Sequence, residues 1–242
     1  ILASADTLAV PGTAEKVVAS NLAARKYLFI RNNDNRVMYI GGSGVDGKIN
    51  AINYIREKNI PFLGLCYGMQ LALVEYARNV CNIKDAHTTE IDKKTNDPVI
   101  DILPTQKELM EKNDYGGTMR LGAYSAVLKD KSKVLEMYKD TGRLKKDLEK
   151  IDVLKKNKSQ EFRLGVLGKN KNVVLERHRH RYEVNPKFVS QLEEKGLVFS
   201  GYHLREDKTK LMEFIELPEH PFFFGTQAHP EFKSRLGNSS PL

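Results

Sequence analysis

A change in the spacing of apolar residues marks the stretch around residues 60–80. Residues 62–65 form a continuous apolar run behind Pro61, which predicts a short buried strand. From Met69 onward the apolar positions recur at helical spacing, which predicts a helix. These positions are Leu73, Tyr76, Ala77 and Val80. A strand, a sharp turn and a helix are therefore expected in immediate succession.

The pattern upstream predicts a second unit of the same kind. A strand is expected at 37–40, a glycine-rich loop at 41–48, and a helix at 49–57 that leads into the strand at 62–65. This order is a βαβ unit, so we expect a parallel sheet covered by helices. Further strands are expected at 27–30, 99–103, 123–128, 173–175, 197–202, 211–217 and 222–227. A first helix is expected from Pro11, Gly12 and Thr13 through Val17, Val18, Leu22 and Ala23.

Composition then limits the class of protein. The 242 residues are 40% hydrophobic and 29% charged, which is typical of a soluble globular α/β domain with a sizeable core. The two cysteines, Cys66 and Cys81, make no disulfide framework, so we expect a reducing, cytoplasmic compartment. No stretch approaches the roughly 20 apolar residues of a membrane span, so no membrane partner is expected.

Most of the net charge of +8 lies in one segment. Residues 139–172 contain eleven Lys and Arg against five Asp and Glu, a surplus of six. Few aromatic residues lie among them, so base stacking and nucleic-acid binding are not favoured. The segment is interpreted as a solvated, mobile insertion.

Cys66 lies between the predicted strand and helix, inside Gly64-Leu65-Cys66-Tyr67-Gly68. This is the arrangement of a nucleophile elbow with sulfur in place of oxygen, in which flanking glycines permit a tight turn. A thiol at a helix N-terminus is also biased towards the nucleophilic thiolate. The alternative is a small buried cysteine at a strand–helix corner. Cys81 has no elbow glycines and no identifiable base, so we interpret it as a packed thiol.

The glycine loop permits three interpretations. Gly42 to Lys48 nearly spells a phosphate-binding loop, but Ile49 stands where that motif needs a magnesium-binding hydroxyl. The loop could instead aim backbone N–H groups at a developing negative charge, as an oxyanion hole does. A tight turn without a ligand remains the third possibility.

A candidate base lies near the C-terminus, in Gln227-Ala228-His229-Pro230-Glu231. In an extended chain His229 and Glu231 project to the same side, so the carboxylate can orient the imidazole. His229 could then act as the base for a thiol. A surface turn is the alternative for these residues considered alone.

The run from Arg177 to Tyr182 alternates arginine and histidine. In a strand the arginines would share one face, suited to a carboxylate or phosphate, and His178 and His180 would share the other. No further ligands at metal-binding spacing accompany these two histidines, so no metal site is expected.

These motifs together resemble the class I (triad) glutamine amidotransferases, and more narrowly the C-terminal glutaminase domain of CTP synthases. The resemblance rests on Gly64–Gln70, His229–Glu231, residues 73–80, 116–122 and 176–186, and the tail from His229 to Leu242. It covers about residues 40–242 of a single domain spanning 1–242, in which 1–40 match poorly and 139–172 are an insertion. It implies a flavodoxin-like α/β fold, with a mostly parallel central sheet flanked by helices and a smaller antiparallel sheet.

The resemblance also implies roles for individual residues. Cys66 would attack the amide carbon of L-glutamine, His229 would transfer the proton, and Glu231 would hold the imidazole. The N–H groups of Gly42 and Tyr67 would form the oxyanion hole. Glutamine would be bound by Gly42, Tyr67, Gly68, Met69, Gln70, Glu90 and Arg181, with Glu90 at the α-ammonium and Arg181 near the α-carboxylate.

For the whole enzyme, the resemblance implies that ammonia passes to a synthetase domain, which uses ATP and Mg²⁺ to aminate UTP to CTP. GTP would be the activator, the full-length protein a homotetramer, and this domain itself free of cofactors. Two other functions stay open: a nucleotide- or RNA-binding module using the glycine loop and lysine segment, and a catalytically silent regulatory domain of the same fold.

Overall fold

The computed structural model describes residues 18–22, 25–31, 37–40, 44–103, 119–156 and 163–242. Its helices are α1 (Val45–Glu57), α2 (Tyr67–Asn79), α4 (Lys133–Asp140), α5 (Arg143–Leu154), α6 (Pro186–Glu194) and the 3₁₀ helix η2 (Pro230–Phe232). Its strands are β1 (Val18–Leu22), β2 (Arg25–Arg31), β3 (Val37–Ile40), β4 (Phe62–Leu65), β5 (Ala86–Thr88), β6 (Asp97–Asp101), β7 (Arg120–Leu128), β8 (Val173–His180), β9 (Glu183–Val184), β10 (Val198–Leu204), β11 (Lys210–Glu216) and β12 (Phe223–Thr226).

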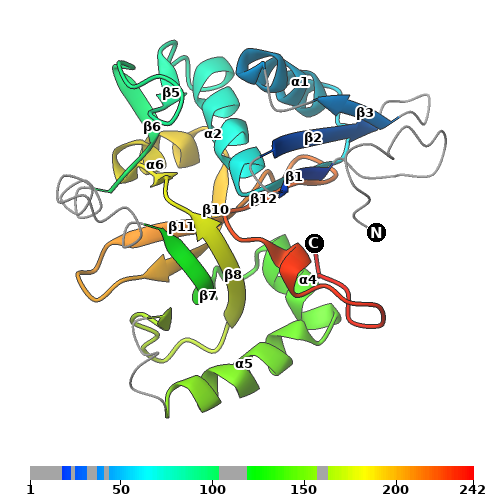
Figure 1. Ribbon diagram of the computed structural model, residues 1–242, viewed down its shortest axis with the longest axis vertical. Helices are drawn as coiled ribbons and strands as arrows, with labels where there is room; N and C mark the ends of the chain where they lie inside the picture. The colour runs from blue at the N-terminus through cyan, green and yellow to red at the C-terminus, as the bar shows by residue number, and fades with distance from the viewer. Residues whose placement is uncertain (1–17, 23–24, 32–36, 41–43, 104–118, 157–162) are drawn as a thin grey trace.

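The strands form an α/β fold, as expected from the sequence (Figure 1). The larger sheet has the order β3-β2-β1-β4-β12-β11-β10-β7-β8, and the smaller sheet has the order β5-β6-β9. In the larger sheet β4 pairs in parallel with β1 and β12, while the pairs on either side of this centre are antiparallel. The pairing is therefore more antiparallel than expected, because short connections such as β10–β11 and β11–β12 form hairpins. The smaller sheet is mixed rather than antiparallel.

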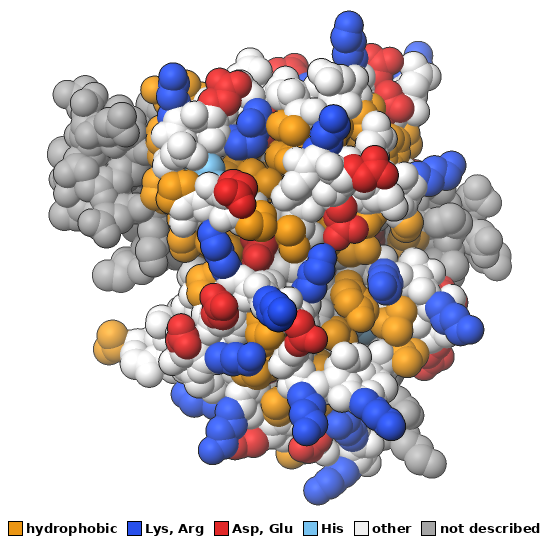
Figure 2. Space-filling model, turned by 180° about the vertical axis from the view of Figure 1, so that it is seen from behind, with side chains coloured by type: hydrophobic (Ala, Val, Ile, Leu, Met, Phe, Trp, Pro, Cys, Tyr) orange, Lys and Arg blue, Asp and Glu red, His pale blue; other side chains and the backbone are white. Residues whose placement is uncertain are grey.

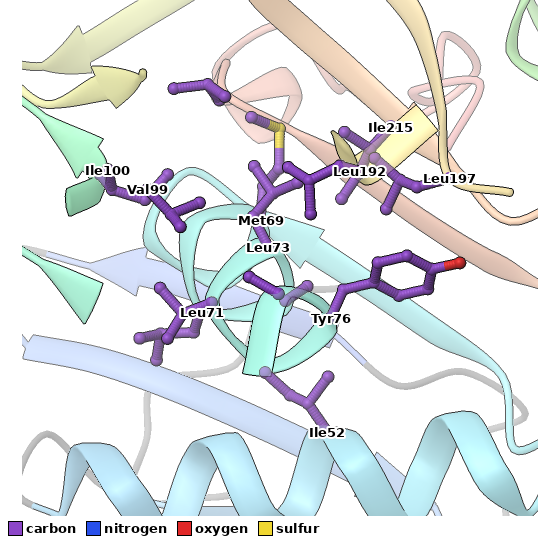
Figure 3. Close-up of a cluster of buried hydrophobic side chains, with 14 of the residues drawn as sticks. Ile52, Met69, Leu71, Leu73, Tyr76, Val99, Ile100, Leu192, Leu197 and Ile215 are labelled. Carbon is purple, nitrogen blue, oxygen red and sulfur yellow. The ribbon is translucent and has the colours of Figure 1, made fainter. Parts of the chain in front are cut away.

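Helix α2 lies at the centre of the main hydrophobic core (Figure 3). Its side chains Met69 and Leu73 are fully buried and belong to the same cluster as Ile52 of α1 and Ile215 of β11. The apolar residues whose spacing predicted this helix are therefore buried on more than one side of it. No helix in the described ranges is long and apolar enough to cross a membrane.

The first predicted helix is wrong over the residues that the structure describes. Val18–Leu22 forms strand β1, which pairs antiparallel with β2 and parallel with β4. The part of this prediction at 11–17 lies outside the described residues. A run of five residues cannot separate helical from strand periodicity, so pairing with β4 decides the conformation.

Part of the lysine-rich segment is a packed helix rather than the solvated, mobile stretch expected from its charge. Its residues 143–154 form α5, whose Ile151 is buried and whose Leu148 packs beside it, in a core cluster shared with Val173 and Leu175 of β8. Lys and Arg side chains are frequent on the face shown in Figure 2, with Asp and Glu among them. Residues 143–154 contain four Lys and Arg against three Asp and Glu, so most of the surplus charge lies after this amphipathic helix, in residues 155–172.

Gly64 allows the sharp turn between β4 and α2 because the backbone of the helix lies directly against it. A Cβ atom at Gly64 would lie 2.8 Å from the carbonyl carbon of Gly68 and 2.8 Å from the nitrogen of Met69. These are backbone atoms of a packed helix, so moving them aside would require a shift of the helix itself. We expect Gly64→Ala to lower the free energy of unfolding by about 1–3 kcal/mol, measured by denaturant unfolding.

Gly47→Ala is the matched control for this substitution. Gly47 is an exposed residue of α1, and a Cβ there would meet nothing within 4 Å. Alanine has the higher helix propensity, so this variant should be stabilised by about 0.5–1 kcal/mol. Equal effects at the two glycines would contradict the close approach of Gly64 and α2.

Candidate active site

Cys66 stands at the turn between β4 and α2 in a strained backbone conformation. Its φ of 51° and ψ of −101° lie in a region that residues other than glycine rarely adopt. It is followed at once by Tyr67, the first residue of α2, so the sulfur lies at the positive end of the helix dipole. The predicted strand, turn and helix are confirmed, and both cysteines are free thiols.

The parallel pairing of β4 with β12 brings the C-terminal motif to Cys66. In this register Thr226 lies opposite Leu65, and the Cys66 N–H donates to the Thr226 carbonyl at 2.7 Å. The carboxyl ends of neighbouring parallel strands meet at one edge of a sheet, where α/β proteins place their sites. The chain continues from β12 through Gln227 to His229, which is also anchored by its N–H to the Arg177 carbonyl at 2.7 Å.

His229 and Glu231 form the predicted pair. The Nδ1 atom of His229 lies 2.6 Å from the Glu231 carboxylate, and the imidazole is buried. The expected extended conformation is wrong, because Pro230 to Phe232 forms the 3₁₀ helix η2, and it is this turn that brings the carboxylate to the ring. Phe232 stacks on the imidazole with centroids 5.0 Å apart.

The surroundings of His229 favour its charged form. Burial lowers its pKa, but the hydrogen bonds and charges of Cys66 and Glu231 raise it to about 10. Nδ1 is bonded to Glu231, whereas Nε2 is buried with no hydrogen-bond partner among the described residues, so Nε2 is the ring atom available to the Cys66 sulfur. A sulfur beside a stabilised imidazolium is the pair that a cysteine nucleophile requires.

This pKa gives an expected pH dependence. The folded value of about 10 exceeds the ordinary value of 6.5, so the stabilisation by protonated His229 is fully present below about pH 6.5. It is lost as the pH rises towards 10. An NMR titration of the ring signals measures the folded midpoint, and Glu231→Gln should lower it. His203, whose pKa burial lowers to about 4, is an internal reference. A wild-type His229 midpoint near 6.5 would contradict this arrangement.

Several predicted glutamine-binding residues meet around Tyr182. The Gln70 side chain donates to the Tyr182 carbonyl at 3.0 Å, and Arg181 is the preceding residue. The pKa of Tyr182 is raised by burial and then by the Glu90 carboxylate, which also raises that of Tyr67 after burial. Gln70, in the first turn of α2, therefore contacts the residue that follows Arg181, and the charge of Glu90 acts on both Tyr67 and Tyr182.

The remaining predicted positions differ in what they could offer a ligand. Gly68 and Met69 are buried in the first turn of α2, and the Met69 side chain packs in the core against Gly225. Only the backbone of Met69 could face a ligand. Gly42 lies outside the described residues, so its predicted N–H has no position here.

The glycine loop does not continue as a phosphate-binding loop at its described end. Gly47 and Lys48 lie inside α1, which begins at Val45. Lys48 is buried, with its Nζ 5.7 Å from the centroid of the Tyr67 ring. In a phosphate-binding loop the glycine and lysine approach the phosphates at the start of the helix.

Strand β8 has the predicted alternation. Arg177 and Arg179 are exposed, while His178 and His180 are buried. Both histidines face a cluster in which Arg120 bridges Glu183 at 3.2 Å and Glu213 at 2.7 Å, and His180 reaches Glu183 at 2.9 Å. Among the described residues no group of three or more His, Cys, Asp or Glu could hold a metal ion.

Two residues around the site were not singled out from the sequence. Gln227 donates to the Cys66 sulfur at 3.5 Å, and Lys233 joins the segment after η2 to Asp147 of α5. Gln227 lies two residues before His229, but no local sequence pattern indicates that its side chain contacts Cys66, which is 161 residues away in the chain.

Comparison with known proteins identifies the family. The family model described as glutamine amidotransferase class-I matches residues 25–242. A CTP synthase of Natronomonas pharaonis is 48% identical over 201 residues, which is 83% of this chain and 30% of that protein. A CTP synthase of Bacillus subtilis is 42% identical over 232 residues, which is 95% of this chain and 36% of that protein.

A solved structure agrees with these relatives. The glutaminase domain of Trypanosoma brucei CTPS with bound acivicin superposes with a TM-score of 0.63 at 31% identity, covering 84% of this chain and 64% of that one. The chain spans about a third of the length of the curated relatives named above. With a matching family model over most of its length, the chain belongs to the class-I glutamine amidotransferase family, as a homologue of the glutaminase domains of CTP synthases.

Proposed function

We propose that Cys66, His229 and Glu231 are the catalytic triad with which this glutamine amidotransferase domain hydrolyses L-glutamine. The observation that carries the proposal is the meeting of a strained elbow cysteine with a buried histidine whose Nδ1 lies 2.6 Å from Glu231. The two parts of the site follow the parallel neighbours β4 and β12, so the sheet holds them in register.

The reaction follows from these positions. The Cys66 thiolate attacks the side-chain amide carbon of glutamine, and protonated His229 gives its proton to the departing ammonia. Water then adds to the thioester while His229 accepts a proton from it, which releases glutamate and regenerates the thiolate–imidazolium pair. Glu231 keeps Nε2 towards the sulfur throughout, because its carboxylate holds Nδ1.

The substrate would be held at the first turn of α2. The backbone N–H groups of Tyr67 and Gly42 would stabilise the tetrahedral oxyanion, where one donor contributes about 3 kcal/mol. Glu90 would bind the α-ammonium group and Arg181 the α-carboxylate, each by charge complementarity. The T. brucei homologue with bound acivicin supports a ligand site in this fold.

The wider reaction is proposed from the relatives. In a protein that also carries a synthetase domain, ammonia would pass to that domain for the amination of UTP to CTP. ATP and Mg²⁺ would serve the synthetase reaction, GTP would activate glutamine use, and the whole protein would form a tetramer. The described helices and glycine loop provide no observation that favours the nucleotide- or RNA-binding alternative.

A glutamine-like electrophile tests the proposed site directly. Incubation should attach one label to Cys66, found by peptide mass mapping, and excess L-glutamine should slow the labelling. Cys81 is the internal control: both thiols are buried, but that of Cys81 is directed at the Gln191 carbonyl, and burial raises its pKa. Equal labelling of both cysteines, or no protection by glutamine, would contradict the proposal, and labelling without ammonia release would indicate a catalytically silent domain.

A further inference from the structure

The side chain of Gln227 lies between the nucleophile and the glutamine-binding turn. Gln227 is fully buried directly after β12, where its backbone N–H bonds to β11 and its side chain is left for other contacts. Its Nε2 donates to the Cys66 sulfur at 3.5 Å, and its Oε1 accepts from Gln70 Nε2 at 3.2 Å. A buried amide with both ends bonded has a defined orientation.

The backbone at Tyr182 determines that orientation. A carbonyl oxygen only accepts, so the end of Gln70 that lies 3.0 Å from the Tyr182 carbonyl must be its NH₂ group. The same nitrogen reaches Gln227, which must therefore present its oxygen to Gln70. The NH₂ group of Gln227 then faces Cys66. Turning the Gln227 amide over would set its NH₂ group against that of Gln70 and its oxygen against the sulfur, so that neither contact would be a hydrogen bond.

The distance between Gln227 and Cys66 is set by the sheet. The Gln227 N–H donates to the Glu213 carbonyl at 2.8 Å, and the Cys66 N–H donates to the Thr226 carbonyl at 2.7 Å. Gln70 and Gln227 are both at most 2% exposed, so water offers little competition for these bonds. The amide is thus held in place before any substrate arrives.

We infer that Gln227 is a positioning residue for the nucleophile, whose N–H holds the Cys66 sulfur and favours its thiolate form. The inference rests on the proposed function, in which this sulfur attacks glutamine. A donor to an ionisable atom stabilises its charged form, and a bond to an anion is stronger than one to a neutral atom. The same N–H would stabilise the thiolate again when it leaves the thioester.

Gln227 acts beside charged groups that also influence the sulfur. His229 faces it from the chain after β12, with Glu231 behind, and Tyr67 follows it on α2 with Glu90 nearby. Gln227 differs from these groups because it does not titrate. Its removal should therefore move the pH profile of the thiol without adding a new ionisation.

The test measures the rate at which iodoacetamide alkylates Cys66 between pH 5 and 10, in a Cys81→Ala background. Gln227→Met, which cannot donate, should lower the rate at pH 7 about tenfold and move the midpoint of the profile to higher pH. Gln227→Asn, with the same amide on a shorter arm, should behave like Gln227→Met. Gln227→Glu should be slower still, because a carboxylate would face the sulfur.

Thr226→Val is the matched control. Its hydroxyl accepts from the Ala228 N–H and does not reach the sulfur, so this variant should keep the wild-type alkylation profile. Where glutamine turnover is measurable, Gln227→Met should lower kcat with little change in KM. A folded Gln227→Met with the wild-type alkylation profile would overturn the inference.

The outcome for Gln227 is separable from that of the proposed function. Alkylation needs no glutamine. If the wild-type protein does not hydrolyse glutamine, the proposed function is rejected, but the alkylation test of Gln227 can still be carried out. If the substitutions prevent folding, the side-chain NH₂ signals of Gln227 in the wild type provide the measurement. These signals should titrate with the midpoint of Cys66 alkylation, and constant signals would overturn the inference.

Discussion

Cys66→Ala is expected to reduce ammonia release from glutamine by at least about 10⁴-fold, because it removes the proposed nucleophile. Attack would then depend on water in place of the proposed cysteine nucleophile. The fold should persist: alanine adopts the φ of 51° no more easily than cysteine, so the local strain stays the same. The measurement is glutamate and ammonia release at saturating glutamine, with circular dichroism to verify folding.

Cys81→Ala is the control for this substitution. Cys81 is 8% exposed, packs in the core near the end of α2, and its sulfur lies 3.7 Å from the Gln191 carbonyl. Its replacement should leave turnover within about twofold of the wild type and cost some stability through the lost packing. Turnover that survives in Cys66→Ala would remove Cys66 from the reaction and with it the proposed triad.

Lys233→Met is expected to lower the free energy of unfolding by about 3–5 kcal/mol, because it leaves two buried carboxylates without their cation. The Lys233 ammonium lies 3.0 Å from Asp147 and 3.1 Å from Glu176, and it also donates to the Leu175 carbonyl. Asp147 is fully buried, and Glu176 is 2% exposed. One side chain thus connects α5, β8 and the segment that follows η2.

The pH dependence of this loss identifies its cause. Burial raises the pKa of Glu176, and the charge of Lys233 opposes that rise. Without Lys233 the neutral acid is favoured further, so the destabilisation should be smaller at pH 5 than at pH 8. Denaturant unfolding of both proteins at the two pH values provides the measurement.

Lys155→Met serves as the comparison for Lys233→Met. The Lys155 ammonium lies 3.0 Å from Asp152 on α5, but the two side chains are 54% and 69% exposed. An exposed pair of this kind contributes at most about 1 kcal/mol, so this variant should unfold almost as the wild type does. Similar small effects at both lysines would mean that Lys233 does not brace the segment carrying His229.

The elbow could be predicted from the sequence because its signals are local. The apolar run at 62–65, the helical spacing after Met69 and the glycines beside Cys66 each act within a few residues. The alternation of exposed arginines and buried histidines in β8 could also be predicted, because neighbouring side chains of a strand point to opposite faces of the sheet. The pairing of His229 with Glu231 was also predicted, although through an extended chain rather than the turn of η2.

The errors arose where distant segments decide the conformation. Val18–Leu22 is a strand because β2 and β4 pair with it. Residues 143–154 of the lysine-rich segment form a packed helix because the apolar face of α5 lies on β8 and Asp147 reaches Lys233. A count of charges hides such a face, since the buried residues of an amphipathic helix are a minority in its sequence.

By itself the sequence determined the separate parts of this protein: the βα elbow with its thiol, the pairing of His229 with Glu231, the alternating strand and the family. Only the tertiary structure decided how the parts meet. Gln227 and Cys66 are 161 residues apart in the chain. The contact between their side chains depends on the parallel register of β12 against β4. The physical reason is that turn chemistry and periodicity act between near neighbours, whereas strand register is set by packing of the whole core.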